Sequence, residues 1–163
     1  MLSAPDPSAP VEISGGSRLA HAFWPAAYHA LRWLEPLLDP IWGRVPLGNV
    51  VQLIVRGRRF GQPRRVYVGL LHAGGNWYLG HPDLPCEWTL NLEAAGGEIR
   101  YPDGRTWRFM AVPLEPGPER DAVIRSTFRQ HPFPGTVLYW LGRNHLRAVG
   151  RFYRLEDSAS EDA

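Results

Sequence analysis

Five arginines lie within the ten residues from Arg56 to Arg65, and no acidic residue accompanies them. Two glycines in the same segment, Gly57 and Gly61, free the backbone to approach a ligand closely. Like charges crowded in this way repel one another unless water or an anion lies between them. Because guanidinium groups match the oxygen atoms of phosphate and carboxylate, the segment predicts a binding site for an anionic ligand. A solvated hairpin tip is the alternative interpretation.

Two predicted strands place these arginines at the tip of a β-hairpin. Residues 50–55 form a dense β-branched run before the arginines, and residues 66–72 form a second run after them. Turn-forming residues separate further runs of this kind along the chain. These runs predict strands at residues 77–80, 98–101, 106–114, 136–141 and 145–155.

Three helical segments are predicted around the strands. Residues 18–42 carry apolar side chains at helical spacings but are interrupted by prolines, which predicts a kinked helix or two short helices. Residues 85–95 place apolar side chains on one face and are followed by two glycines that end a helix. Residues 116–130 begin with acids and end near Arg129, the polarity that the helix dipole favours.

The composition indicates one domain with a substantial core. Of 163 residues, 44% are hydrophobic and 12% aromatic, while 17 glycines and 16 prolines cut the apolar runs into short segments. We therefore predict a mainly β (α+β) fold, a small antiparallel barrel of about six or seven strands with three peripheral helical segments. The domain is placed at residues 18–157, with an N-terminal helical segment at 18–43 and disordered tails at 1–17 and 158–163.

Several kinds of chemistry are excluded by the residue types. All 18 basic residues are arginine, so neither a Schiff-base lysine nor a P-loop lysine is available. The single Cys86 excludes an intrachain disulfide and a cysteine-based zinc site, and it fits a cytoplasmic protein. The histidines are scattered, so no metal site is expected. Residues 13–155 carry 18 arginines against 10 acids, a balance that attracts anions.

The order of residues around the arginines carries more information than their number. Two motifs occur in sequence, Gly57-Arg58-Arg59-x-Gly61-x-Pro63-Arg64 and, after two predicted strands, Trp88-x-x-Asn91-Leu92-x-Ala94-Ala95. Together they resemble the deazaflavin-dependent nitroreductase family, with definite motifs over residues 50–114 and a looser likeness to residue 155. The resemblance implies a split β-barrel, related to the flavin-binding pyridoxamine phosphate oxidase fold. It also implies coenzyme F-420 as cofactor, with FMN as the alternative.

The resemblance assigns the basic residues and the second motif to the cofactor site. By position, Arg58, Arg59 and Arg64 receive the phosphate and the acidic tail of the coenzyme. The predicted cofactor-binding set consists of Arg58, Arg59, Gly61, Pro63, Arg64, Tyr78, His81, Trp88 and Asn91. For Trp88 the alternative role is a core anchor, and for Asn91 it is a hydrogen bond at a helix end.

Two features around this set decide the chemistry that is expected. Residues 80–86 replace a Ser-Lys-Gly-Gly-like loop found in many family members, with His81 as a candidate substitute for the lysine. Aromatic side chains such as Tyr78, Trp88 and Tyr139 could stack the cofactor ring or an acceptor. The resemblance also makes Tyr139 a candidate proton donor, with water as the alternative, and it is the one predicted catalytic residue.

The predicted function is an oxidoreductase that transfers hydride from reduced coenzyme F-420 to an apolar acceptor, namely a quinone, a nitro compound or an enone. A non-catalytic carrier of flavin, haem or lipid is the first alternative, which the altered loop favours. A binder of anionic surfaces or nucleic acid is the second, and it is disfavoured because the arginines concentrate in one turn. We expect a cytoplasmic monomer or homodimer, with contact to a membrane surface through residues 18–42 left open.

Overall fold

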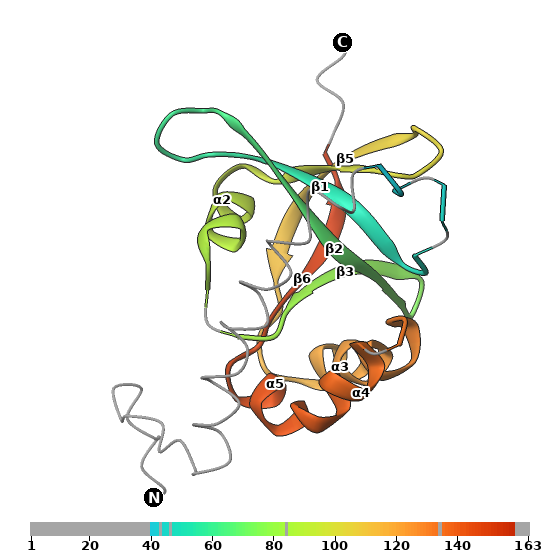
Figure 1. Ribbon diagram of the computed structural model, residues 1–163. Helices are drawn as coiled ribbons and strands as arrows, with labels where there is room; N and C mark the ends of the chain where they lie inside the picture. The colour runs from blue at the N-terminus through green and yellow to red at the C-terminus, as the bar shows by residue number, and fades with distance from the viewer. Residues whose placement is uncertain (1–39, 43, 46, 84, 134, 159–163) are drawn as a thin grey trace, which may run out of the picture.

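The computed structural model describes residues 40–42, 44–45, 47–83, 85–133 and 135–158 (Figure 1). Within them six antiparallel strands close into a barrel in the order β1-β2-β3-β6-β5-β4. The strands are β1 (Val50–Arg56), β2 (Pro63–Ala73), β3 (Asn76–His81), β4 (Gly97–Arg100), β5 (Thr106–Pro113) and β6 (Arg151–Asp157). The predicted mainly β fold and antiparallel barrel are confirmed.

Alternation along the strands fills the inside of the barrel. In β1 the side chains of Val51, Leu53 and Val55 are buried, and each shares its face with the residue opposite it on β2. One apolar cluster therefore occupies the barrel interior, which we call the barrel core. Its buried members are Val51, Leu53, Val55, Leu70, Leu79, Leu92, Ile99, Phe109, Tyr153 and Leu155.

Four helices surround the barrel in the described part of the chain: α2 (Glu87–Ala95), α3 (Pro118–Gln130), α4 (Gly135–Leu141) and α5 (Arg143–Val149). Helix α2 packs against β1 and β5 and contributes Leu92 to the barrel core. The other three gather at the opposite end of the molecule from the β1–β2 turn (Figure 1), and we call them the helical layer. A second apolar cluster joins this layer to the outer side of β2, β3 and β6.

The two helices predicted from sequence within the described residues are confirmed. Helix α2 begins at Glu87, after Cys86, whose backbone N–H donates to Thr89 Oγ1 at 2.9 Å. Burial raises the pKa of the Cys86 thiol, in keeping with an unreactive side chain. Helix α3 has Pro118 in its first turn and Arg129 in its last, as the dipole argument predicted.

In the last third of the chain, one predicted strand is wrong and another is only partly right. Residues 136–141 form helix α4, and the first half of 145–155 forms helix α5, so the last strand begins only at Arg151. The β-forming side chains of α4 favoured a strand locally, but packing against α3 overrides that preference. Gly135 begins α4, while Gly142 and Gly150 flank α5 at its two ends.

The predictions for the chain ends fall mostly outside the described residues. These are the disordered tail at 1–17, most of the helical segment at 18–43 and the tail at 158–163, of which only Ser158 is described. Trp42 is described and forms an isolated bridge with Val45. Among the described residues, no helix is both long enough and apolar enough to cross a bilayer.

Candidate functional site

The arginine-rich segment forms the turn between β1 and β2, as predicted. The turn is closed by two backbone hydrogen bonds, from Gly57 N–H to the Gln62 carbonyl and from Gly61 N–H to the Gly57 carbonyl, both 2.9 Å long. Gly61 has a φ of 64°, a left-handed conformation that other residues adopt only with strain. We call residues 56–65 the basic hairpin.

The two sequence motifs meet at Arg58 and Asn91. The side-chain oxygen Oδ1 of Asn91 accepts two hydrogen bonds, from the Arg58 backbone N–H at 3.1 Å and from Arg58 Nε at 3.2 Å. Asn91 is a buried residue of α2. Arg58 also donates to Oε2 of Glu87, another residue of α2, at 3.3 Å. Helix α2 thus fixes both the backbone and the guanidinium at the start of the turn.

The remaining arginines of the hairpin have no partner of this kind. Arg56, Arg59, Arg64 and Arg65 are all exposed, and none forms an ion pair within the described part of the chain. Arg64 lies opposite the inward-facing Val55, whereas Arg65 lies opposite Ile54 on the other face. Arg64 therefore continues the face of the barrel core, while Arg56 and Arg65 extend the outer face. Such a group attracts an anion, because these four arginines have no acidic partner among the described residues.

His81, the last residue of β3, contacts Trp88 of α2. Their rings meet edge to face, with centroids 5.6 Å apart and planes at 89°. His81 is only 3% exposed, and Trp88 packs against the barrel core. Trp88 is thus only partly buried where it packs on the barrel core, and His81 is buried beside it.

Tyr78 and Tyr139 lie away from this group, in contact with the helical layer. Tyr78 is buried in the second cluster and donates from its hydroxyl to Glu119 Oε1 at 3.0 Å. Desolvation raises the pKa of Tyr78 above its ordinary value. Tyr139 belongs to α4, and its ring packs on His131 with centroids 4.3 Å apart. The structure therefore brings Arg58, Trp88, Asn91 and His81 to α2 and leaves both tyrosines elsewhere.

Two polar pairs, one of them buried and the other with a buried tyrosine, were not foreseen from the sequence. His145 Nε2 lies 3.1 Å from Asp83 Oδ1, and both side chains are almost fully buried. Tyr153, at 0% exposure in the barrel core, donates its hydroxyl proton to Glu93 Oε1 at 2.7 Å. The partners are separated by 62 and 60 residues, and no spacing rule links such positions. Only the unusual loop at residues 80–86 gave a signal, because it contains Asp83.

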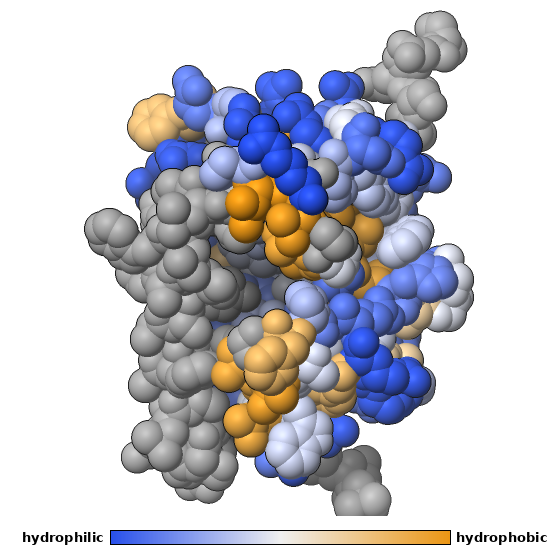
Figure 2. All heavy atoms as spheres, turned by 45° about the vertical axis from the view of Figure 1, so that its right-hand side comes forward, coloured by the Kyte–Doolittle hydropathy of each residue, from blue (hydrophilic) through white to orange (hydrophobic). Residues whose placement is uncertain are grey.

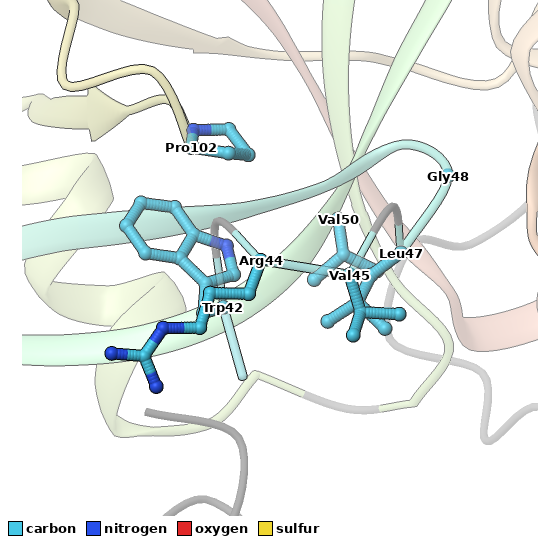
Figure 3. Close-up of a pocket in the computed structure, with 7 residues that line it drawn as sticks. All are labelled: Trp42, Arg44, Val45, Leu47, Gly48, Val50 and Pro102. Atoms are coloured by element: carbon cyan, nitrogen blue, oxygen red, sulfur yellow. The ribbon is translucent and has the colours of Figure 1, made fainter. Parts of the chain in front are cut away.

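A cavity of about 330 Å³ lies outside β1, lined by Trp42, Arg44, Val45, Leu47, Gly48, Val50 and Pro102 (Figure 3). In this view the indole of Trp42 lies toward Pro102, while the aliphatic side chains gather on the other side. Val50 starts β1 and Arg56 ends it, so the cavity and the basic hairpin lie about 20 Å apart along the strand. Among the described residues, no group of three or more metal-ligating side chains is positioned to hold a metal ion.

Comparison with known proteins identifies the fold. No protein-family model matches the sequence, and no curated protein matches it significantly. Rv2991, a conserved hypothetical protein from Mycobacterium tuberculosis, superposes with a TM-score of 0.50 at 13% identity, over 76% of this chain and 79% of that one. The chain has the split β-barrel fold. At this identity the likeness extends to the fold alone.

Two other solved structures are similar. Atu2129, of unknown function, from Agrobacterium tumefaciens has a TM-score of 0.49 and 18% identity, over 76% of this chain and 55% of that one. HutZ, the heme storage protein from Vibrio cholerae, has a TM-score of 0.48 and 15% identity, over 77% of this chain and 90% of that one. This chain thus spans about half the length of Atu2129.

Proposed function

We propose that this protein is an oxidoreductase that uses reduced coenzyme F-420 to reduce a quinone, a nitro compound or an enone. The observation that carries the proposal is the basic hairpin. Asn91 fixes Arg58 by two hydrogen bonds, while Arg59 and Arg64 are exposed without an ion pair among the described residues. The resemblance of this hairpin and of the α2 motif to deazaflavin-dependent nitroreductases supports the identity of the anion.

The donor set fits the anionic end of such a coenzyme. Phosphate and carboxylate oxygens accept paired hydrogen bonds from guanidinium groups, and two such groups are available at Arg59 and Arg64. Arg58 is shared with Glu87 and Asn91, so it shapes the turn more than it binds. The bound coenzyme would supply the hydride, and the protein would hold and orient it.

The buried position of His81 affects which residues can contribute to the binding of the coenzyme's anionic end. In many family members a lysine-containing loop helps to hold the coenzyme, but here His81 is buried against Trp88. A side chain that is only 3% exposed has little contact with an anion at the surface. We therefore assign most of the anion-binding energy to the basic hairpin.

Fluorescence titration of the purified protein with coenzyme F-420, and separately with FMN, tests the proposal. We expect saturable binding of the first in the micromolar range and, under anaerobic conditions, oxidation of the reduced coenzyme when a soluble quinone is added. Absence of binding at tens of micromolar would end the proposal.

A non-catalytic carrier of flavin, haem or lipid on the same barrel is the second candidate. One observation favours it: Tyr139, the predicted proton donor, belongs to the helical layer and not to the group around the basic hairpin. A carrier would bind its ligand without turnover. Purified protein that keeps a visible flavin or haem spectrum, and that oxidises no reduced coenzyme F-420, would favour this second function.

A further inference from the structure

One exposed apolar surface has no role in the proposed cofactor site. It is formed by Phe133, Val137, Trp140 and Leu141, which are 84%, 45%, 52% and 64% exposed. Their spacings of three and four residues place them along one side of α4 and of the turn before it. The opposite side of α4 faces the protein, since Tyr139 packs against the second cluster. We call these four residues the α4 patch.

The apolar character of this region is visible on the surface. In Figure 2, apolar side chains gather over the lower part of the molecule, where Figure 1 shows the helical layer. Large exposed apolar side chains that cluster in this way mark an interaction site more often than scattered ones do. Because α4 contains no charged residue, nothing on the helix itself opposes burial of the patch.

Only positive charges surround the α4 patch in the sequence. Residues 122–155 contain six arginines and no aspartate or glutamate. The Arg143 guanidinium lies over the Trp140 ring at 4.5 Å from its centroid and donates to the Trp140 carbonyl at 3.1 Å. Arg147 and Arg129 are exposed on the neighbouring helices α5 and α3. The patch is thus an apolar surface with the positive charge of Arg143 directly beside it.

We propose that the α4 patch docks this protein onto an anionic lipid bilayer. Aromatic and aliphatic side chains enter the interfacial region of a bilayer, and arginines pair with lipid phosphates beside them. The positive charge of Arg143 beside the patch disfavours a second copy of the chain as the partner, because a symmetric contact would bring like charges together. A single-stranded nucleic acid would bind through the arginines and the aromatic rings, but its binding would not account for the exposure of the aliphatic Val137 and Leu141.

This docking mode is separate from the cofactor proposal and from residues 18–42, most of which lie outside the described residues. The basic hairpin lies at the end of the molecule opposite the helical layer (Figure 1). A protein held to a membrane by α4 would therefore keep the hairpin accessible to a water-soluble anion. The lipid-docking proposal and the cofactor proposal are therefore independent of each other.

Vesicle flotation tests the proposal on the full chain without any cofactor. We expect binding to vesicles with equal parts of phosphatidylcholine and phosphatidylglycerol, and little binding to phosphatidylcholine alone. Phe133→Ser combined with Leu141→Ser should weaken partitioning at least about tenfold. Arg143→Ala with Arg147→Ala should weaken binding to the anionic vesicles about tenfold as well. Met110→Ser, which removes a 47% exposed apolar side chain from β5, is the matched control and should leave binding unchanged.

Several results would overturn the proposal. They include no binding to anionic vesicles, or vesicle binding that Phe133→Ser with Leu141→Ser leaves intact. If Phe60→Ser alone abolishes binding, the basic hairpin is the membrane contact. If the α4 variants lose binding to a single-stranded oligonucleotide, or dissociate a dimer seen by light scattering, while no vesicles are bound, the patch serves a different partner. Thermal unfolding of each variant verifies that the fold is retained.

Discussion

Asn91 is the residue on which the shape of the basic hairpin depends most directly. Its Oδ1 accepts hydrogen bonds from both the backbone and the side chain of Arg58, and the amide is buried. Sequence reasoning placed Asn91 beside the cofactor or at a helix end. The structure gives it a third role, in which it positions an arginine of the other motif.

Asn91→Ala should therefore affect both stability and cofactor binding. Two donors on Arg58 lose their acceptor, so we expect a loss of about 1–3 kcal/mol in the free energy of unfolding. Coenzyme affinity should fall as well, because the turn is no longer fixed. Chemical denaturation and fluorescence titration measure the two effects. Asn144→Ala, at an exposed position of α5, should change neither; equal effects of the two substitutions would remove Asn91 from this role.

Tyr153 makes stability depend on pH in the alkaline range. Burial, together with the hydrogen bond to Glu93, raises the pKa of this phenol above its ordinary value. Since the unfolded state then loses its proton first, the stabilising contribution is complete below the unfolded pKa of about 10 and is lost as pH rises above it. Tyr78 and Tyr101 are shifted in the same direction, so they share this effect.

Tyr153→Phe isolates the contribution of this residue. We expect a loss of about 1 kcal/mol at neutral pH, from the missing hydrogen bond, and a shallower decline of stability between about pH 9 and 11. Thermal unfolding over that range measures both. An unchanged alkaline slope would show that the Tyr153 proton is not held more tightly in the folded protein.

At the scale of elements, the predictable parts are those specified by local residues. The apolar runs at residues 50–55 and 66–72 predicted β1 and β2, and acids followed by Arg129 predicted α3. Helices α4 and α5 were missed because their stability comes from contacts with α3, which no local pattern reveals. The basic hairpin was foreseen for the same local reason. The family motif selected Asn91, but the hydrogen bonds that join it to Arg58, 33 residues away, were not predicted.

Arg120 is one of the contacts that hold α5 in place. From α3 its guanidinium donates to the carbonyls of Leu146, Arg147 and Gly150, at 3.3, 3.0 and 2.8 Å. These carbonyls end α5 and carry the negative end of its dipole, so a buried cation satisfies both the hydrogen bonds and the charge. Helix α5 therefore depends on a side chain from another helix.

Arg120→Met should destabilise the protein by about 3 kcal/mol or more, because it removes three hydrogen bonds, including those to the carbonyls of Arg147 and Gly150, while the Leu146 carbonyl keeps the Gly150 N–H as donor. For a chain of this size, the corresponding decrease in melting temperature is about 6–12 °C. Arg125→Met, at an exposed position of the same helix, is the matched control and should shift it by no more than about 2 °C. Differential scanning calorimetry makes the comparison, and similar melting temperatures for both variants would contradict the capping role.

Gly96 shows why the junction between α2 and β4 allows no side chain. Its φ is 65° with ψ −158°, a combination that is essentially confined to glycine, and a Cβ would collide with the carbonyl oxygen of Phe109. Gly104 also has a positive φ, 87°, but a Cβ there would meet no atom within 4 Å. Comparing substitutions at Gly96 and Gly104 therefore distinguishes the cost of steric overlap from the cost of the backbone conformation alone.

Gly96→Ala should cost about 3 kcal/mol or more, whereas Gly104→Ala should cost about 1 kcal/mol, from its conformation alone. Urea denaturation at equilibrium distinguishes these values. Equal losses for the two variants would mean that the backbone at Gly96 moves to accept the methyl group.

At the scale of the whole molecule, the barrel separates two surfaces with different chemistry. The basic hairpin and α2 form one end, where exposed arginines gather, and the helical layer forms the other, with the α4 patch (Figure 1). The charge balance calculated from the sequence indicated a basic protein. It did not show that the basic hairpin and Arg143, which lies over Trp140, belong to opposite ends of the molecule (Figure 1).

The central claim is that Arg59 and Arg64 hold the anionic end of coenzyme F-420. The most direct measurement is a fluorescence titration of three proteins: the wild type, the Arg59→Ala/Arg64→Ala variant and the Arg56→Ala/Arg65→Ala variant. The last pair lies on the outer face of the hairpin and removes the same amount of charge. We expect affinity at least about 100-fold weaker in the first variant, and within about threefold of the wild type in the second. Equal losses in both variants, or no loss in either, would contradict the claim.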